Sequence, residues 1–105
     1  MYGHLNNSFI SDFEPSEFYL SQNFPNPFKE KTVIKYCVAY KTRVRLNVYD
    51  NEGKEIEKLV DEEQNPGTYE IVLHSTLGSR HLAIGNYYYH LEAGNYNCKK
   101  KMQIL

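Results

Sequence analysis

The chain consists of short runs in which apolar and polar residues alternate. In the run 43–50, Val44, Leu46 and Val48 are separated by polar residues. Such alternation is typical of strands in a sheet with one face against a core and the other toward water. The runs that we interpret as strands are Phe18–Gln22, Thr32–Val38, Arg43–Asp50, Lys54–Val60, Thr68–His74, 86–92 and Tyr96–Leu105.

Turn residues separate these runs at intervals typical of a small β-sandwich or barrel. Gly53 closes a tight turn after Asp50, the acidic segment 61–67 is expected to be a loop, and Gly94-Asn95 is expected to form a type II′ hairpin turn. No run has convincing helical periodicity. The sequence therefore predicts an all-β antiparallel fold of about seven strands. Its expected core is Ile34, Tyr36, Val44, Leu46, Val48, Tyr69, Ile71, Leu73, Tyr87, Tyr89 and Leu91.

Three segments do not follow the alternating pattern. Residues 1–17 are polar and aperiodic, so we interpret them as a linker or tail that precedes a domain at 18–105. The segment 23–28 has two prolines, which exclude it from the centre of a sheet, and we expect it to run along an edge with Phe24 and Phe28 turned inward. The stretch 75–84 is expected to be looser.

Composition and charge narrow the classes of function. The 105 residues carry a formal net charge of −1, and the chain lacks the basic field that attracts nucleic acid. The apolar runs are too short to span a membrane, so no stable membrane insertion is expected. The first residues do not resemble a signal peptide, which leads us to expect a fragment of a longer protein if the chain is exported.

Catalytic, metal and cofactor motifs are not visible in the sequence. His4, His74, His81 and His90 are scattered, and the acidic run at 61–63 lacks the spacing of a calcium loop. We therefore expect neither an enzyme nor a bound cofactor or metal. Cys37 and Cys98 lie on predicted strands, one on the outer and one on the core face, so two free thiols are favoured over a disulfide.

Two aromatic or basic runs suggest binding, but strand geometry weakens both. In Tyr87-Tyr88-Tyr89 only Tyr88 is expected to face outward, which is a poor platform for a sugar. The lysines at 99–101 are expected to point to alternate faces and to discourage aggregation at a sheet edge.

The order of several motifs resembles the type A C-terminal sorting domains of the type IX secretion system. The resemblance covers about residues 18–105 and rests first on the proline motif, with Asn23, Pro25, Asn26, Pro27 and Phe28. Further matching segments are 32–36, 48–50, 53–55, 66–69, 85–94 and 100–105. The resemblance implies an immunoglobulin-like or fibronectin-like sandwich, related to a domain of flagellar hook-capping proteins. It also implies an upstream cargo domain and passage through the periplasm to the outer-membrane secretion and attachment machinery. The protein would then be secreted or held at the cell surface.

The last hairpin and strand are the expected recognition surface, because a partner strand can add to an exposed sheet edge. The candidate residues are Gly94, Asn95, Lys100, Lys101 and Met102. Gly94-Asn95 can equally be a simple turn and Met102 a simple core residue. Two alternative functions stay open: a structural module, and a carbohydrate-binding accessory module that uses Tyr88 or Tyr19.

Overall fold

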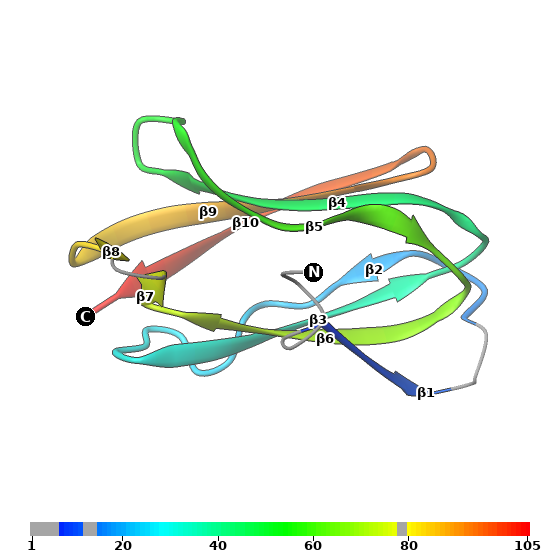
Figure 1. Ribbon diagram of the computed structural model, residues 1–105, viewed down its shortest axis with the longest axis horizontal. Coiled ribbons are helices and arrows are strands. Elements are labelled where there is room, and N and C mark those ends of the chain that lie inside the picture. Colours follow the sequence, from blue (N-terminus) through cyan, green and yellow to red (C-terminus); the bar gives the residue numbers. More distant parts are fainter. Residues whose placement is uncertain (1–6, 12–14, 78–79) are drawn as a thin grey trace.

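The fold is a sandwich of two antiparallel four-stranded sheets (Figure 1). The computed structural model describes residues 7–11, 15–77 and 80–105, none of which is helical. One sheet has the order β1-β6-β3-β2, the other has the order β10-β9-β4-β5, and β7-β8 form a small separate hairpin. The strands are β1 (Asn7–Ser11), β2 (Tyr19–Leu20), β3 (Lys31–Val38), β4 (Thr42–Asp50), β5 (Glu55–Gln64), β6 (Gly67–His74), β7 (Thr76–Leu77), β8 (Arg80–His81), β9 (Gly85–Ala93) and β10 (Tyr96–Ile104).

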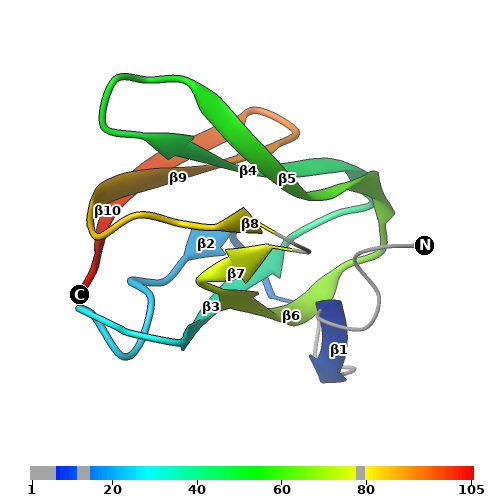
Figure 2. The same cartoon turned by 60° about the vertical axis from the view of Figure 1, so that its left-hand side comes forward.

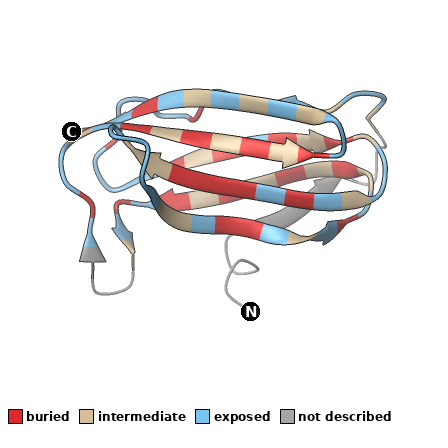
Figure 3. Cartoon of the chain, turned by 90° about the horizontal axis from the view of Figure 1, so that it is seen from above, coloured by how far each residue is buried: buried red, intermediate tan, exposed pale blue. Residues whose placement is uncertain are grey.

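The core lies between the two sheets and follows the alternation of the sequence (Figure 3). All eleven residues predicted for the core are buried, and Leu46 at the centre of β4 is fully enclosed, at 0% exposure. Tyr36 is buried as well, and its hydroxyl donates to Gln64 Oε1 at 2.8 Å. The core therefore includes tyrosine hydroxyls that have partners, as buried polar groups require.

The seven predicted strands correspond to β2, β3, β4, β5, β6, β9 and β10. The eighth sandwich strand, β1, lies within the segment that we interpreted as a linker or tail, and it pairs with the edge of β6. A strand without an alternating pattern can join a sheet edge because the ladder bonds are made by backbone groups. The looser stretch contains β7 and β8, which lie at the end of the sandwich near the C-terminus (Figure 2).

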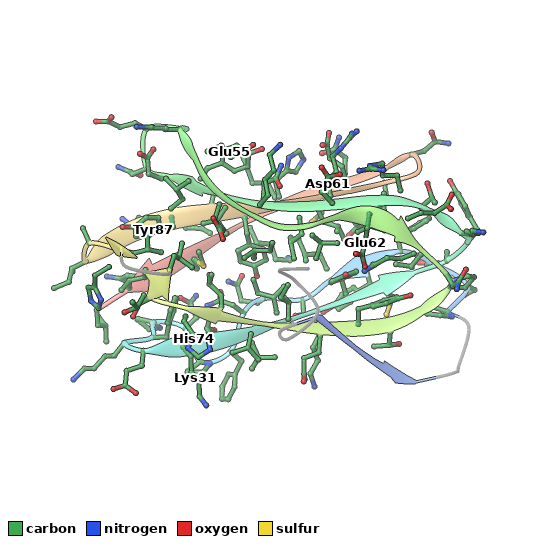
Figure 4. The ribbon with its side chains drawn as sticks, viewed as in Figure 1. Lys31, Glu55, Asp61, Glu62, His74 and Tyr87 are labelled. Atoms are coloured by element: carbon green, nitrogen blue, oxygen red, sulfur yellow. The ribbon has the colours of Figure 1, made fainter. Side chains whose placement is uncertain are left out.

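The prediction of an acidic loop at 61–67 was wrong, because β5 continues through Gln64 and pairs with β4 as far as Thr42. Arg43 on β4 stabilises this acidic strand: its Nε lies 3.0 Å from Asp61 Oδ1. Asp61 points to the outer side of the sheet and Glu62 toward the other sheet (Figure 4). Opposite charges on neighbouring strands thus allow an extended conformation where composition alone indicates a loop.

The orientation of Phe24 was also predicted wrongly, whereas that of Phe28 was confirmed. Phe24 is 78% exposed and Phe28 is 2% exposed. Phe24 pairs with Val33, which lies on the outer side of β3 between the buried residues Thr32 and Ile34. Residues that are directly opposite in an antiparallel pair share a face of the sheet, so Phe24 faces outward.

Candidate recognition surface

The last strand, β10, is an edge strand of its sheet. It pairs with β9 from Tyr96 opposite Ala93 to Ile104 opposite Gly85, without a register shift. Met102 and Ile104 are buried on the inner face, while Lys99 and Lys101 are exposed on the outer face. The other edge of β10 is therefore the place where the sheet can meet another segment.

The proline motif closes the C-terminal half of that edge. We call residues 22–28 the strap. The Phe28 N–H donates to the Gln103 carbonyl at 3.0 Å, and the Leu105 N–H donates to the Phe28 carbonyl at 2.8 Å. The Gln103 N–H donates to Asn26 Oδ1 at 3.0 Å. A chain segment from the start of the domain thus runs beside its last strand.

The first half of the strap is fixed to both sheets. Gln22 Nε2 donates to the Lys101 carbonyl of β10 at 2.7 Å. Phe24 exchanges two backbone hydrogen bonds of 2.9 Å with Val33 of β3. The strap therefore connects the edges of two sheets that have no ladder bonds in common.

Asn23 organises the strap from inside. Its side chain is 2% exposed, and Nδ2 donates to Thr32 Oγ1 at 3.0 Å and to the Pro25 carbonyl at 3.2 Å. Its Oδ1 accepts from Gln22 Nε2 at 2.8 Å. The Thr32 hydroxyl in turn donates to the Pro25 carbonyl at 2.7 Å. This network supplies polar partners to a proline-rich turn that has few backbone donors of its own.

Tyr89 supports the strap from the core. Its side chain is 0% exposed, and its hydroxyl donates to the Ser21 carbonyl at 2.7 Å. Burial raises the pKa of this hydroxyl above its ordinary value, against a smaller opposite effect of the hydrogen bond with the Asn23 backbone. The hydroxyl therefore stays protonated at neutral pH and can hold the chain at the start of the strap.

Among the described residues, the N-terminal half of the β10 edge has no comparable cover. Along an antiparallel edge strand, the backbone groups of every second residue point away from the partner strand. The strap bonds involve Lys101, Gln103 and Leu105, so the backbone groups of Asn97 and Lys99 point to the same side. Within the described ranges, no strand pairs with β10 on this side. We call the segment Asn97–Lys99 the open edge.

The predicted recognition residues lie in different environments. Gly94 and Asn95 form an exposed two-residue turn, with φ of 58° at Gly94 and no positive φ at Asn95, as in the predicted type II′ turn. A Cβ at Gly94 would lie 2.9 Å from Tyr40 Cζ. The positive φ and the close approach of Tyr40 each explain why a glycine occupies this position.

The lysines and Met102 separate by face, as strand alternation predicts. Lys101 is exposed on the outer face, whereas Lys100 is partly buried on the inner face. Met102 is 1% exposed and packs in the core. Its side chain is therefore not accessible to a partner of the folded domain, and it contributes by holding β10 in place.

Phe24 is a candidate contact residue that the sequence analysis placed on the wrong face. It borders an outer-face groove of about 420 Å³ that Val33, Lys35 and Glu70 also line. Exposed aromatic side chains often act as anchors in protein interfaces. The proline motif draws attention to this position, but its orientation depends on the pairing with Val33.

The described residues do not form a metal centre. Among them, no group of three or more His, Cys, Asp or Glu side chains is placed to hold a metal ion. Cys37 and Cys98 are free and partly buried, on strands of different sheets. His4 and the segment 1–6 lie outside the described residues. A helix that could span a membrane is not found in the described part of the chain.

The fold and the hydrogen bonds along the β10 edge define the class of this protein. It is a β-sandwich domain in which the proline-rich strap and the last strand form one structural unit. The model of the secretion system C-terminal sorting domain family matches residues 22–105. The chain belongs to this family, and it is a C-terminal sorting domain for type IX secretion of a larger protein. Such a tail belongs to secreted or cell-surface proteins.

Comparison with curated proteins and with solved structures gave no match. The matched range begins at Gln22, the first residue of the strap, and ends at Leu105, whose N–H bonds to the strap. The strap, the open edge and the strands from β3 to β10 are therefore within the family domain, whereas β1 and β2 precede the matched range.

Proposed function

We propose that the open edge of β10 is the surface that the outer-membrane secretion and attachment machinery recognises, after the cargo and this domain have reached the periplasm. One observation supports this proposal above the others. The strap occupies the C-terminal half of the β10 edge, and no described backbone group bonds to the outward-pointing backbone groups of Asn97 and Lys99. A partner strand could pair there by β-augmentation, with main-chain hydrogen bonds giving affinity.

Side chains beside the open edge would give such pairing its specificity. Asn95 is exposed at the hairpin tip and Lys101 is exposed on the outer face. Gly94 shapes the turn, and Lys100 lies partly buried on the inner face. In this proposal Asn95 and Lys101 contact the partner, while Gly94, Lys100 and Met102 set the position of β10. The domain acts without catalysis, and residues 1–17 lead from it to the cargo, with β1 within them paired to the edge of β6.

An immunoglobulin-like relationship is part of the proposal. The order β10-β9-β4-β5 corresponds to the G, F, C and C′ strands of an immunoglobulin-like sheet. Tyr87 at the start of β9 donates from its hydroxyl to the Ala83 carbonyl at 2.6 Å. This contact is like the tyrosine corner at the start of strand F in such domains. β1 lies beside β6, the position that strand D has in the constant-type order.

The test is export of a periplasmic reporter fused in front of residues 1–105, in a bacterium that has a type IX system. The key variant is Lys99→Pro, which removes an edge-facing N–H and blocks strand addition. Proline is tolerated on a strand where its nitrogen faces outward, so pairing with β9 should survive. We expect the reporter to stay in the periplasm with Lys99→Pro and to reach the surface or medium with Lys99→Ala.

Two controls separate recognition from folding. Denaturation of the purified variants should show that Lys99→Pro is folded, and a fusion that stops at Asn95 should lose both folding and export. Lys101→Ala tests whether the partner contacts this side chain, because changes at exposed positions usually alter stability by less than about 0.5 kcal/mol. Normal export of a folded Lys99→Pro fusion would show that the secretion machinery does not bind the open edge. Retention of the unchanged fusion would instead favour the structural-module alternative.

A further inference from the structure

The outer face of the β10-β9-β4-β5 sheet has a groove that the sorting function does not require. The pairing of β4 with β5 is irregular between Leu46 and Asn47 and again between Val48 and Tyr49. Bulges increase the twist of a strand pair, and the tip of the β4–β5 hairpin turns away from the sheet (Figure 1). A groove of about 720 Å³ lies between this tip and the outer face of β9 and β10.

The groove has the size of a small-molecule site and an aromatic floor. Sites for small ligands typically measure about 300–1,000 Å³. Tyr49 and Tyr88 are direct cross-strand partners on β4 and β9, and both line the groove. The ring of His90, the next outward residue on β9, lies 6.4 Å from that of Tyr49. Three aromatic side chains therefore line the same groove.

Hydrogen-bond donors and hydrogen-bond acceptors surround these rings. His90 Nε2 is hydrogen bonded to Asn97 Oδ1, and Lys99 Nζ lies 5.3 Å from the centre of the Tyr88 ring. Glu52 contributes a carboxylate from the hairpin tip. Asn47, the cross-strand partner of His90, has a buried Oδ1 with no hydrogen-bond partner among the described residues.

This combination restricts the chemistry of the ligand. No aliphatic side chain is among the described residues that line the groove, which disfavours a purely apolar ligand. Lys99 is accompanied by Glu52, which disfavours a highly charged anion such as a nucleotide. A saccharide has hydroxyls for the amide, imidazole, ammonium and carboxylate groups, and a C–H face that can stack on a tyrosine ring.

We propose that this groove is a binding site for a neutral saccharide, a role that goes beyond the proposed sorting function. The sugar ring stacks on Tyr49 or Tyr88, and the ammonium of Lys99 moves from the Tyr88 face to the ring hydroxyls. Asn97 and His90 bind further hydroxyls. The site uses Tyr88 and not Tyr19, which is exposed on β2 of the opposite sheet.

The experiment is titration of the isotope-labelled chain with a panel of neutral oligosaccharides: gluco-, xylo-, manno- and N-acetylglucosamine oligomers. Amide chemical shifts report the site and the dissociation constant. We expect at least one sugar to shift the amides of Tyr88, Asn97 and Lys99. Tyr88→Ala should weaken its binding about tenfold or more, the effect of losing an aromatic contact in a small site.

Matched variants make the test specific. Tyr88→Phe keeps the ring and should retain most of the affinity, whereas Tyr19→Ala removes an exposed tyrosine outside the groove and should leave binding unchanged. Absence of shifts with every sugar of the panel would overturn the proposal. Equal binding by folded Tyr88→Ala, or shifts confined to another face, would overturn it as well. Reporter export is measured separately, so failure here leaves the edge proposal intact.

Discussion

Asn23 offers a sharp test of the strap, because Asn26 provides a control of the same residue type in the same motif. The Asn23 side chain takes part in three hydrogen bonds and is 2% exposed. Asn26 is exposed, and its side chain accepts one bond, from the Gln103 N–H. Replacing each residue by alanine therefore removes very different numbers of interactions at one site.

The expected magnitudes follow from these contacts. A hydrogen bond contributes about 0.5–1.5 kcal/mol net, and a buried partner left unsatisfied costs more. Asn23→Ala should therefore lower the free energy of unfolding by about 2–4 kcal/mol. Asn26→Ala, which removes one exposed bond, should lower it by about 0.5–1.5 kcal/mol.

Urea denaturation followed by far-UV circular dichroism and tyrosine fluorescence measures both values, since the chain has ten tyrosines and no tryptophan. The denaturant slope should be unchanged if both variants unfold from the same native state. A loss for Asn23→Ala no larger than that for Asn26→Ala would refute the central position of Asn23 in the strap.

Three further predictions test the core, the ion pair and the last turn. Leu46→Ala, at a fully buried position, should cost about 2–5 kcal/mol of unfolding free energy; a loss below about 0.5 kcal/mol would mean that the β4 register is wrong. The hydrogen bond from Arg43 holds the pKa of Asp61 below its ordinary value. Because the carboxylate is more acidic in the folded than in the unfolded chain, this interaction stabilises the folded state at neutral pH, and the stabilisation is lost as the pH falls below about 4. Asp61→Asn should accordingly flatten the acid side of the stability curve, and an unchanged curve would contradict the pairing. Gly94→Ala should cost about 1–2 kcal/mol because of its positive φ and the nearby Tyr40 ring; wild-type stability in denaturation would exclude this structural role.

The sequence predicted those features of the fold that depend on local periodicity. Val44, Leu46 and Val48 alternate with polar residues, and burial of one face is the simplest way to remove them from water. The same reasoning placed Tyr88 outward between two buried tyrosines, which the structure confirms. It could not place Phe24, because the face of that residue is set by pairing with Val33 across the strap.

Other features depend on contacts between distant segments. The acidic end of β5 is a strand because Arg43 lies opposite it, and the hydrophobicity of the segment gives no sign of this. The sequence identified the proline motif and the last strand as separate landmarks. Their contact through Phe28 and Gln103 joins residues 75 positions apart, and a pattern read along the chain does not reveal such a contact. The saccharide groove likewise depends on two bulges in β4–β5 pairing.

The contact between the strap and β10 exists only in the folded domain, and so does the proposed recognition surface. The strap needs the Gln103 backbone as its partner, and the Tyr89 hydroxyl that supports it is placed by the core. The open edge in turn exists only while β10 is paired with β9. A truncated or unfolded chain therefore presents neither half of this edge in its native form. If the open edge is recognised as proposed, the machinery binds a folded surface and not a linear peptide. Variants that unfold the domain should then lose export together with stability, whereas Lys99→Pro should lose export alone.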